Sequence, residues 1–146
     1  ASMLLGTPAR VHAAGTLGAT GVDEQDAILL EHARGAHALL YVSLRSRRSP
    51  DLEVLGESGR IVVGSPVFRP TALTIWSHDG TSVRHEHPID GSGYGAQLLA
   101  VGDALREGRS ECATMPLAES VAVMRVLDAV RARIGLRYPG EPGSLH

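Results

Sequence analysis

The alternation of apolar and polar residues predicts strands in the first two thirds of the chain and helices in the last third. Residues 36–47 form the longest strand candidate, and Arg34-Gly35 separates this run by a tight turn from residues 27–33. Earlier, residues 10–17 form a short run of mostly small residues that ends at a glycine-rich segment. Short runs punctuated by glycine are typical of strands joined by turns.

Two further turn signals predict hairpins. Residues 51–55 and 60–63 flank the loop Gly56-Glu57-Ser58-Gly59, and residues 71–77 and 81–87 flank His78-Asp79-Gly80. An Asp-Gly pair between two strand candidates is a strong short-range hairpin signal. Successive hairpins indicate an antiparallel sheet, and the parallel strand–helix–strand pattern of a nucleotide-binding domain is not seen.

The longest strand candidate has two different faces. One face is entirely apolar, which predicts that it packs in the core: Ala36, Ala38, Leu40, Val42 and Leu44. The other face is half apolar: His37, Leu39, Tyr41, Ser43, Arg45 and Arg47. A face that only meets solvent does not need large apolar residues. We therefore expect another subunit or domain to cover part of the second face.

Two helices are predicted after the strands. The first has an N-cap at Ser92 and a stop at Gly108, and the second begins near Pro116 and ends at Gly135. Each has apolar residues at helical spacing, so each can lie on a sheet. We expect a single α+β domain over residues 1–146, with an open, largely antiparallel sheet and helices packed on one face.

Composition narrows the chemistry. The 14 basic side chains are all arginine, so the chain has no lysine for a Schiff base or for proton donation. A net charge of −2 and an aromatic share of 3% are unfavourable for nucleic-acid binding, and no apolar run is long enough to span a membrane. The single cysteine, Cys112, cannot form an internal disulfide, and no signal peptide is visible. We expect a cytoplasmic protein.

Candidate chemical groups are few. His78, His85 and His87 lie on one predicted hairpin, but without a carboxylate or cysteine at ligand spacing we predict solvated histidines and no metal site. The glycine-rich segment 91–95 opens a helix, where an anion can bind, although a plain loop-to-helix connection is the simpler interpretation. Tyr94 suits either core packing or a polar ligand. Arg48, in the basic cluster at 45–48, suits bidentate contacts.

Several motifs, in this order and spacing, resemble a known family. They are Gly21-Val22-Asp23-Glu24, Gly56-Glu57-Ser58-Gly59-Arg60-Ile61, Gly93-Tyr94-x-x-Gln97, Gly108-Arg109-Ser110-Glu111, and Met115-Pro116-Leu117 through Tyr138-Pro139. Together they resemble the C-terminal domain of the Gfo/Idh/MocA (glucose–fructose oxidoreductase / inositol dehydrogenase) family. The similarity is strongest to the branch with dihydrodiol and xylose dehydrogenases.

The resemblance implies an N-terminal Rossmann domain that binds NAD or NADP, and a C-terminal domain that lines the substrate pocket and packs its sheet against a partner subunit. The family's catalytic lysine lies in the first domain, and Leu4-Leu5-Gly6-x-Pro8 resembles the segment just after the catalytic residues. Transferred to this chain, the family pattern suggests substrate contacts at Tyr94, Arg48 and, less directly, Ser46. Gln97 replaces the family's usual glutamate.

These implications lead to one main hypothesis and one alternative. The chain is expected to be the substrate-binding and dimerisation domain of an NAD(P)-dependent oxidoreductase that acts on a sugar, polyol or cyclic diol. It would contain no catalytic, cofactor-binding or metal residue of its own, and alone it would be inactive. The alternative is a free-standing, non-enzymatic ligand-binding or dimerisation module with the same fold.

Overall fold

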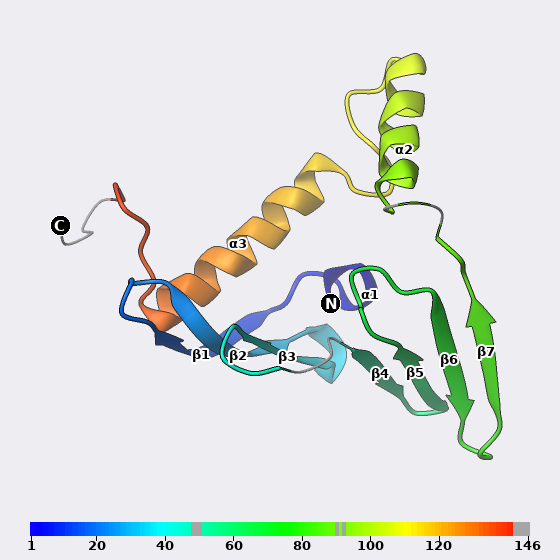
Figure 1. The fold of residues 1–146 in the computed structure, drawn as a ribbon, viewed down its shortest axis with the longest axis horizontal. Coiled ribbons are helices and arrows are strands. Elements are labelled where there is room, and N and C mark those ends of the chain that lie inside the picture. The colour runs from blue at the N-terminus through cyan, green and yellow to red at the C-terminus, as the bar shows by residue number, and fades with distance from the viewer. Residues whose placement is uncertain (48–50, 90, 92, 142–146) are drawn as a thin grey trace. The chain divides into compact units, whose positions relative to one another are not determined.

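In a computed structural model, the chain forms two compact units (Figure 1). The first contains Ala1–Arg47 and Ala113–His146, and the second contains Arg48–Cys112. The structure describes residues 1–47, 51–89, 91 and 93–141. That residues 1–146 act as one domain stays a prediction.

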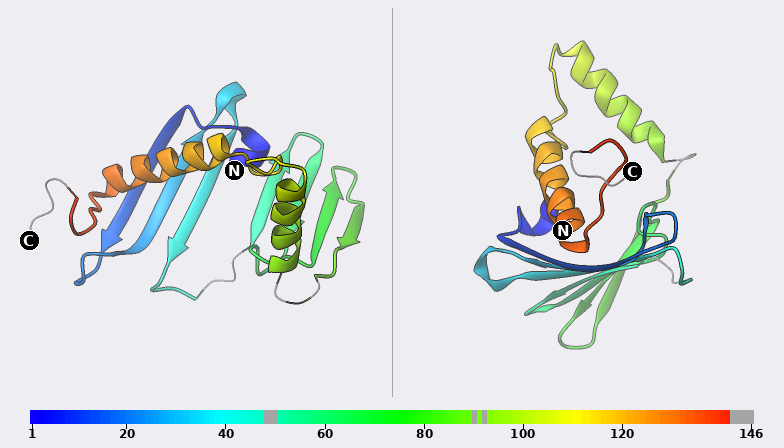
Figure 2. Two further views of the ribbon diagram at one scale, coloured as in Figure 1. Left: turned by 90° about the horizontal axis from the view of Figure 1, so that it is seen from above. Right: turned by 90° about the vertical axis from the view of Figure 1, so that its left-hand side faces the viewer.

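The first unit is a three-stranded antiparallel sheet with a long helix on one face (Figure 2). Its strands, in the order β1-β2-β3, are β1 (Arg10–Leu17), β2 (Asp23–Glu31) and β3 (His37–Ser43). Its helical elements are α1 (Ser2–Leu5), the short 3-10 helix η1 (Ala33–Gly35) and α3 (Leu117–Ile134). The helix α3 packs against β1.

Strand β3 is shorter than the predicted strand 36–47. It ends at Ser43 because the hydroxyl of this residue accepts hydrogen bonds from the backbone N–H groups of Arg45 and Ser46, at 3.0 and 3.1 Å. A serine that satisfies local backbone donors competes with the sheet ladder and favours a turn. The chain therefore leaves the sheet before Arg45.

The core of the first unit lies between α3 and the sheet. Leu30, Val130 and Leu136 are buried there. By contrast, Leu40 and Val42, which we predicted to be core, are 39% and 57% exposed. They share the α3 side of the sheet, but α3 packs against β1, which is two strands away from β3.

Helix α3 begins and ends close to where the sequence predicts. Pro116 is its N-cap, and Gly135 ends it in the left-handed region at φ 75°. The N–H of Leu136 then donates to the carbonyl of Arg131 at 3.0 Å. Glycine at this position relieves the steric cost of a left-handed residue and lets the chain turn away.

The second unit is a four-stranded antiparallel meander followed by a helix. In the order β4-β5-β6-β7 its strands are β4 (Leu52–Gly56), β5 (Gly59–Val63), β6 (Ala72–Ser77) and β7 (Ser82–Glu86). Both predicted hairpins form, and Gly56 pairs with Gly59, so only Glu57 and Ser58 lie between the first two strands. The side chains of the sheet divide into an apolar face and a mixed face that carries Arg60 and Trp76.

Helix α2 (Tyr94–Arg106) completes the second unit. Gly93 occupies its cap position, and Ser92, the predicted N-cap, lies outside the described residues. The apolar residues of α2 are largely exposed, including Leu98 and Leu105 at 71% each. No helix in the described ranges is long and apolar enough to cross a membrane.

Two open antiparallel sheets and few helices confirm the predicted α+β class. Local turn chemistry accounts for the agreement, because glycine and Asp-Gly at the hairpin positions favour the tight turns that antiparallel neighbours need.

Candidate functional site

The loop between β5 and β6 presents an exposed aromatic ring. This loop, residues 64–71, contains two prolines, and its backbone closes a turn in which the N–H of Arg69 donates to the carbonyl of Pro66 at 2.9 Å. The Ser65–Pro66 peptide bond is cis. Phe68 lies within this turn and is 81% exposed. Phe68 is thus an exposed apolar ring on a loop, and loops carry a large share of the binding residues in proteins.

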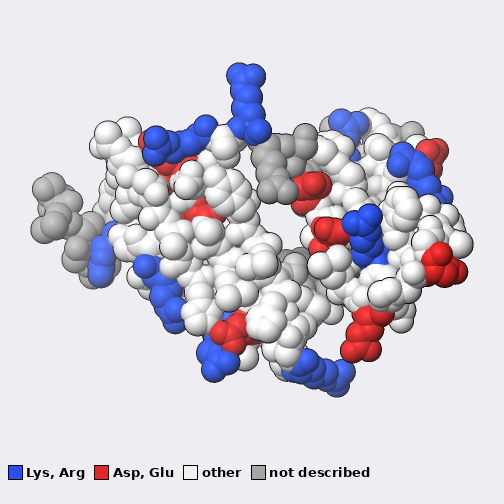
Figure 3. Space-filling model, turned by 90° about the horizontal axis from the view of Figure 1, so that it is seen from below, with Lys and Arg blue, Asp and Glu red and all other residues white. Residues whose placement is uncertain are grey.

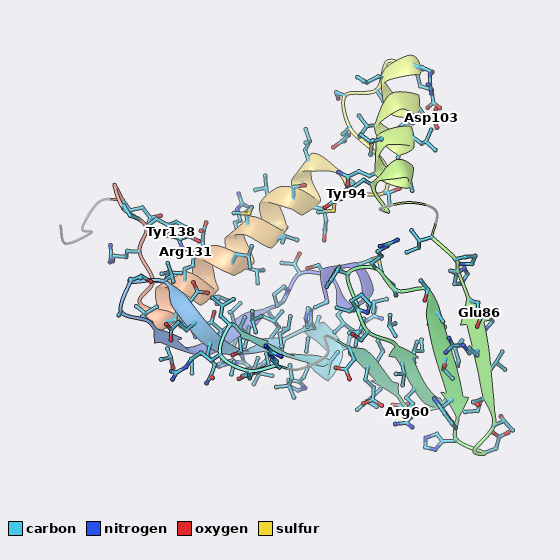
Figure 4. All side chains as sticks on the ribbon, viewed as in Figure 1. Arg60, Glu86, Tyr94, Asp103, Arg131 and Tyr138 are labelled. Carbon is cyan, nitrogen blue, oxygen red and sulfur yellow. The ribbon has the colours of Figure 1, made fainter. Side chains whose placement is uncertain are left out.

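The same loop is tied to the start of α2. The guanidinium of Arg69 donates to the backbone carbonyl of Gly91. From Gly91 the chain enters α2 through Gly93, both of which have a positive φ (63° and 90°). The helix then starts at Tyr94, whose side chain is 68% exposed at the base of α2 (Figure 4). Arg69 therefore holds together two segments that each present an aromatic residue.

The exposed side chains on these two segments differ in chemistry. Tyr94 offers a phenol hydroxyl, which can donate or accept a hydrogen bond, and Phe68 offers only an apolar ring. Gln97, three residues after Tyr94, lies on the same surface of α2 and adds an amide. We call Phe68, Tyr94 and Gln97 the aromatic entry of α2.

The other predicted substrate residues lie elsewhere in the chain. Ser46 is in the bend after β3, in the first unit, and its hydroxyl lies 3.4 Å from the hydroxyl of Tyr41. This hydrogen bond, with a smaller contribution from Ser43, lowers the pKa of Tyr41. Arg48 lies outside the described residues. That Tyr94, Ser46 and Arg48 share one pocket stays a prediction.

Sequence reasoning missed Phe68 and Arg69. Phe68 is the single phenylalanine of the chain and lies between two prolines, in a segment that has no strand or helix pattern. A lone aromatic residue in such a loop is the sequence feature by which it could have been selected as a candidate binding residue. The bond from Arg69 to Gly91 spans 22 residues, and no local pattern predicts it.

The histidines do not assemble into a metal centre in the part of the chain that the structure describes. His78 lies in the β6–β7 turn, His85 in β7 and His87 just after it. Among the described residues, no group of three or more histidine, cysteine, aspartate or glutamate side chains is placed to hold a metal ion. Charged side chains are dispersed between uncharged areas on the surface in view (Figure 3).

A second feature with functional potential is the face of the β1–β3 sheet that points away from α3. The strand register places Ala14, Ala27 and Tyr41 in one row and His12, Leu29 and Leu39 in the next. We call this surface the open face. Leu39 is 83% exposed and Tyr41 is 49% exposed. The half-apolar second face predicted for this strand is therefore present.

An ion-paired cluster borders the open face. Arg10 donates to one carboxylate oxygen of Glu31 at 2.9 Å through Nε and at 2.6 Å through Nη2, and Nε2 of His12 lies 2.5 Å from the other oxygen. The hydrogen bond from Arg10 has the largest effect and that from His12 the next largest, and both lower the pKa of Glu31. An apolar centre with a charged border is the usual pattern of a protein–protein interface.

The chain is similar in sequence to a known protein family and to characterised enzymes. Residues 1–62 match the family model described as the GFO/IDH/MocA C-terminal domain. Trans-1,2-dihydrobenzene-1,2-diol dehydrogenase of Oryctolagus cuniculus is 30% identical over 151 aligned residues, which cover 94% of this chain and 44% of that protein. The chain thus spans less than half the length of this curated relative.

Solved structures share the fold. UDP-N-acetylglucosamine 3-dehydrogenase from Acidithiobacillus ferrooxidans superposes with a TM-score of 0.70 at 19% identity, covering 91% of this chain and 43% of that one. An oxidoreductase from Agrobacterium radiobacter, in complex with NAD+, L-tartaric acid and magnesium, gives 0.69 at 17% identity, covering 92% and 43%. The resemblance noted in the sequence is confirmed: residues 1–62 match the model of the GFO/IDH/MocA C-terminal domain, and the chain is similar to trans-1,2-dihydrobenzene-1,2-diol dehydrogenase over 94% of its length.

Proposed function

We propose that this chain is the substrate-binding and dimerisation domain of an NAD(P)-dependent oxidoreductase that acts on a sugar, polyol or cyclic diol. The observation that carries the proposal is the similarity to trans-1,2-dihydrobenzene-1,2-diol dehydrogenase over 94% of the chain. The structural neighbours add sugar-nucleotide and NAD+-binding oxidoreductases with the same fold.

The aromatic entry of α2 is the proposed substrate contact, together with Ser46 and Arg48. A sugar or a cyclic diol has ring C–H groups beside hydroxyl groups. Phe68 can pack against the first kind of group, and the hydroxyl of Tyr94 can hydrogen-bond to the second. The bond from Arg69 to Gly91 supports this role because it joins the backbone segments that carry Phe68 and Tyr94 before the substrate arrives.

The nicotinamide and its proton-transfer partner belong to the rest of the parent protein in this proposal. When bound, the nicotinamide supplies hydride transfer. The chain contains no lysine, so the lysine that the family resemblance implies must come from another segment. The isolated chain should therefore neither bind NAD(P) tightly nor catalyse oxidation. A single cysteine is compatible with the cytoplasmic location that we still propose.

The parent enzyme is proposed to be a homo-oligomer that buries the open face. Exposing the apolar side chains of Leu39 and Tyr41 to water is unfavourable, and covering them with a second copy of the chain is favourable. Because a twofold dimer joins the same patch on both subunits, the charged border of Arg10, His12 and Glu31 would lie at the rim of the interface.

The test of this function is an assay of the full coding sequence with NAD+ and NADP+. The expected result is reduction of the nucleotide with trans-1,2-dihydrobenzene-1,2-diol, a pyranose sugar or a cyclic polyol as substrate. Tyr94→Phe should raise KM by about tenfold through the loss of one hydrogen bond. Tyr138→Phe, the same chemical change far along the chain, is the matched control and should leave KM unchanged.

The contrary result is equally clear. A coding sequence without a nucleotide-binding unit, or a protein that reduces neither nucleotide with any of these substrates, would favour the non-enzymatic module. Tight NADPH binding by the isolated 146-residue chain would contradict the proposed division of roles.

A further inference from the structure

Strand β7 is an edge strand of the β4–β7 sheet, and no described strand pairs with its outer side (Figure 1). All of its residues, Ser82–Glu86, are exposed. An open edge presents unpaired backbone N–H and C=O groups that can pair with a strand of another chain, and proteins often prevent this with prolines, bulges or charges. The pairing of β7 with β6 is regular, and the strand contains no proline. Its charges therefore decide whether the edge repels or accepts a second strand.

The backbone groups of β7 that point outward follow from its hydrogen bonds to β6. Just after the strand, the N–H of His87 donates to the carbonyl of Thr71 at 2.7 Å, on the β6 side. In an antiparallel ladder, successive residues alternate between bonding to the neighbouring strand and pointing away from it. The N–H and C=O groups of Ser82, Arg84 and Glu86 are therefore directed outward, where a second strand can reach them.

The two charged side chains of β7 have opposite signs and lie on the same face, with His85 between them in sequence. Nε of Arg84 lies 3.2 Å from Oε1 of Glu86, and both side chains are largely exposed (Figure 4 labels Glu86). Such an exposed pair contributes little by itself, so each charge can take a further partner. Because the two charges are placed symmetrically about His85, the edge is complementary to an antiparallel copy of itself.

We propose that β7 is a self-association edge, at which two copies of the chain pair antiparallel with His85 opposite His85. In this register the outward backbone groups of Arg84 bond to those of Glu86 in the second copy, and the two side chains form an ion pair across the strands. Sliding one strand by two residues places Arg84 opposite Arg84 or Glu86 opposite Glu86, and like charges directly opposite are unfavourable. The inference uses only the second unit and does not rest on the proposed function.

This contact is separate from the open face and weaker than a permanent interface. Stable protein interfaces bury about 1,200–2,000 Å² in total, and the edge of one short strand buries less than that. The paired state is therefore transient, and it does not hold two copies together during sedimentation. A covalent trap records such a state where a mass measurement does not.

A cysteine at position 85 tests the register. The two His85 residues would form a non-hydrogen-bonded pair with Cα atoms about 4.5 Å apart, which a disulfide can span. We would make His85→Cys in a Cys112→Ser background, oxidise it with glutathione disulfide and quantify the linked dimer by non-reducing electrophoresis. Val83→Cys is the matched control: Val83 is 57% exposed on the same face of β7. In this register its two copies lie about 14 Å apart along the strands. His85→Cys should give about ten times more linked dimer than this control.

Charge reversal tests the ion pairs. Added to His85→Cys, Arg84→Glu places a carboxylate opposite Glu86 and should lower the linked fraction by about tenfold. Glu86→Arg should do the same, and Arg84→Glu combined with Glu86→Arg should restore the linked fraction because opposite charges face each other again. Arg106→Glu is the control, because Arg106 is an exposed arginine that is also paired within its own chain but lies on α2. It should leave the linked fraction unchanged.

Three outcomes would overturn the proposal. The first is equal cross-linking of His85→Cys and Val83→Cys in chains whose circular dichroism shows them folded. The second is a disulfide that joins a His85→Cys copy only to a Val83→Cys copy, because that register centres on Arg84 and brings like charges together. The third is loss of the cross-link in Leu39→Glu, which would assign the contact to the open face. An unchanged cross-link in Leu39→Glu separates the edge from the dimer of the proposed function.

Discussion

Arg131 and Glu141 form a two-point ion pair that fastens the segment after α3 back onto the helix. Nη2 of Arg131 donates to both carboxylate oxygens of Glu141, at 2.6 and 2.7 Å, and the guanidinium carbon lies 3.9 Å from the centroid of the Tyr138 ring. The N–H of Tyr138 donates to the same carboxylate at 3.0 Å. The ion pair and the ring contact thus meet at Arg131, and the backbone bond joins the same ion pair at Glu141 (Figure 4 labels Arg131 and Tyr138).

Glu141→Gln should lower the melting temperature of the chain by a few degrees at neutral pH. The pKa of Glu141 is lowered below its ordinary value mainly by the hydrogen bond from Arg131 and, to a smaller extent, by the N–H of Tyr138. A carboxylate with a lowered pKa stabilises the fold above its unfolded pKa, and this contribution is lost as pH falls through the folded pKa. The difference from wild type, measured by thermal denaturation, should disappear in acid. Glu57→Gln, in an exposed turn, should show no difference at either pH.

Asp26→Asn should have the opposite effect and stabilise the chain at neutral pH. Asp26 is buried, and its Oδ1 has no hydrogen-bond partner among the described residues. The pKa of Asp26 is raised mainly by burial and, to a smaller extent, by the neighbouring Asp23. A raised carboxyl pKa means that the fold is most stable below the unfolded pKa and loses stability as pH rises through the folded pKa. The melting temperatures of variant and wild type should converge near pH 3, and a less stable variant at pH 7 would contradict this account.

Gly15→Ala should destabilise the first unit by about 1–3 kcal/mol through overpacking. A Cβ atom at Gly15 would lie 2.2 Å from Oδ1 of Asp26 and 2.9 Å from Cγ2 of Ile134, between the sheet and α3. Urea denaturation measures the change. Gly95→Ala is the control, because a Cβ at this helical position meets nothing within 4 Å and alanine favours a helix. It should be neutral or stabilising.

Leu39→Glu should convert the proposed dimer to a monomer. Leu39 is 83% exposed on the open face, where burial against a second copy would leave a new carboxylate without solvent. Sedimentation at high protein concentration distinguishes the two masses. Met3→Glu, at a residue that is 90% exposed in α1, is the control and should keep the wild-type mass. A wild-type chain that stays monomeric at high concentration would contradict the interface itself.

Local chemistry explains which parts of the fold were predictable. The hairpins at Gly56–Gly59 and Asp79-Gly80 and the end of α3 at Gly135 all depend on residues within a few positions of one another. The length of β3 was overestimated because the Ser43 hydroxyl takes two backbone donors that an alternating pattern assigns to the strand. The alternation of apolar and polar residues does not reveal that a side-chain hydroxyl competes with the sheet for backbone hydrogen bonds.

The exposure of Leu40 and Val42 and the role of Arg69 depend on distant parts of the chain. Which apolar face is covered is decided by where α3 lies, and the sequence of β3 carries no information about that. Tyr94 as a substrate contact stays a prediction from family resemblance, and Phe68 was not predicted because its loop is tied to the segment before α2 only by the bond from Arg69 to Gly91. The pattern of a single strand cannot predict contacts of this range.

The bond from Arg69 to Gly91 also means that the 64–71 loop has an anchor outside the two strands it connects, so its sequence can be replaced. It begins after β5 and ends before β6, so its length and its aromatic residue can change without altering the register of either strand. As long as an arginine reaches the carbonyl before α2, a new loop is held in the same place. If Phe68 contacts the substrate as proposed, replacing this loop would change ligand preference while the sheet and helices are left unchanged.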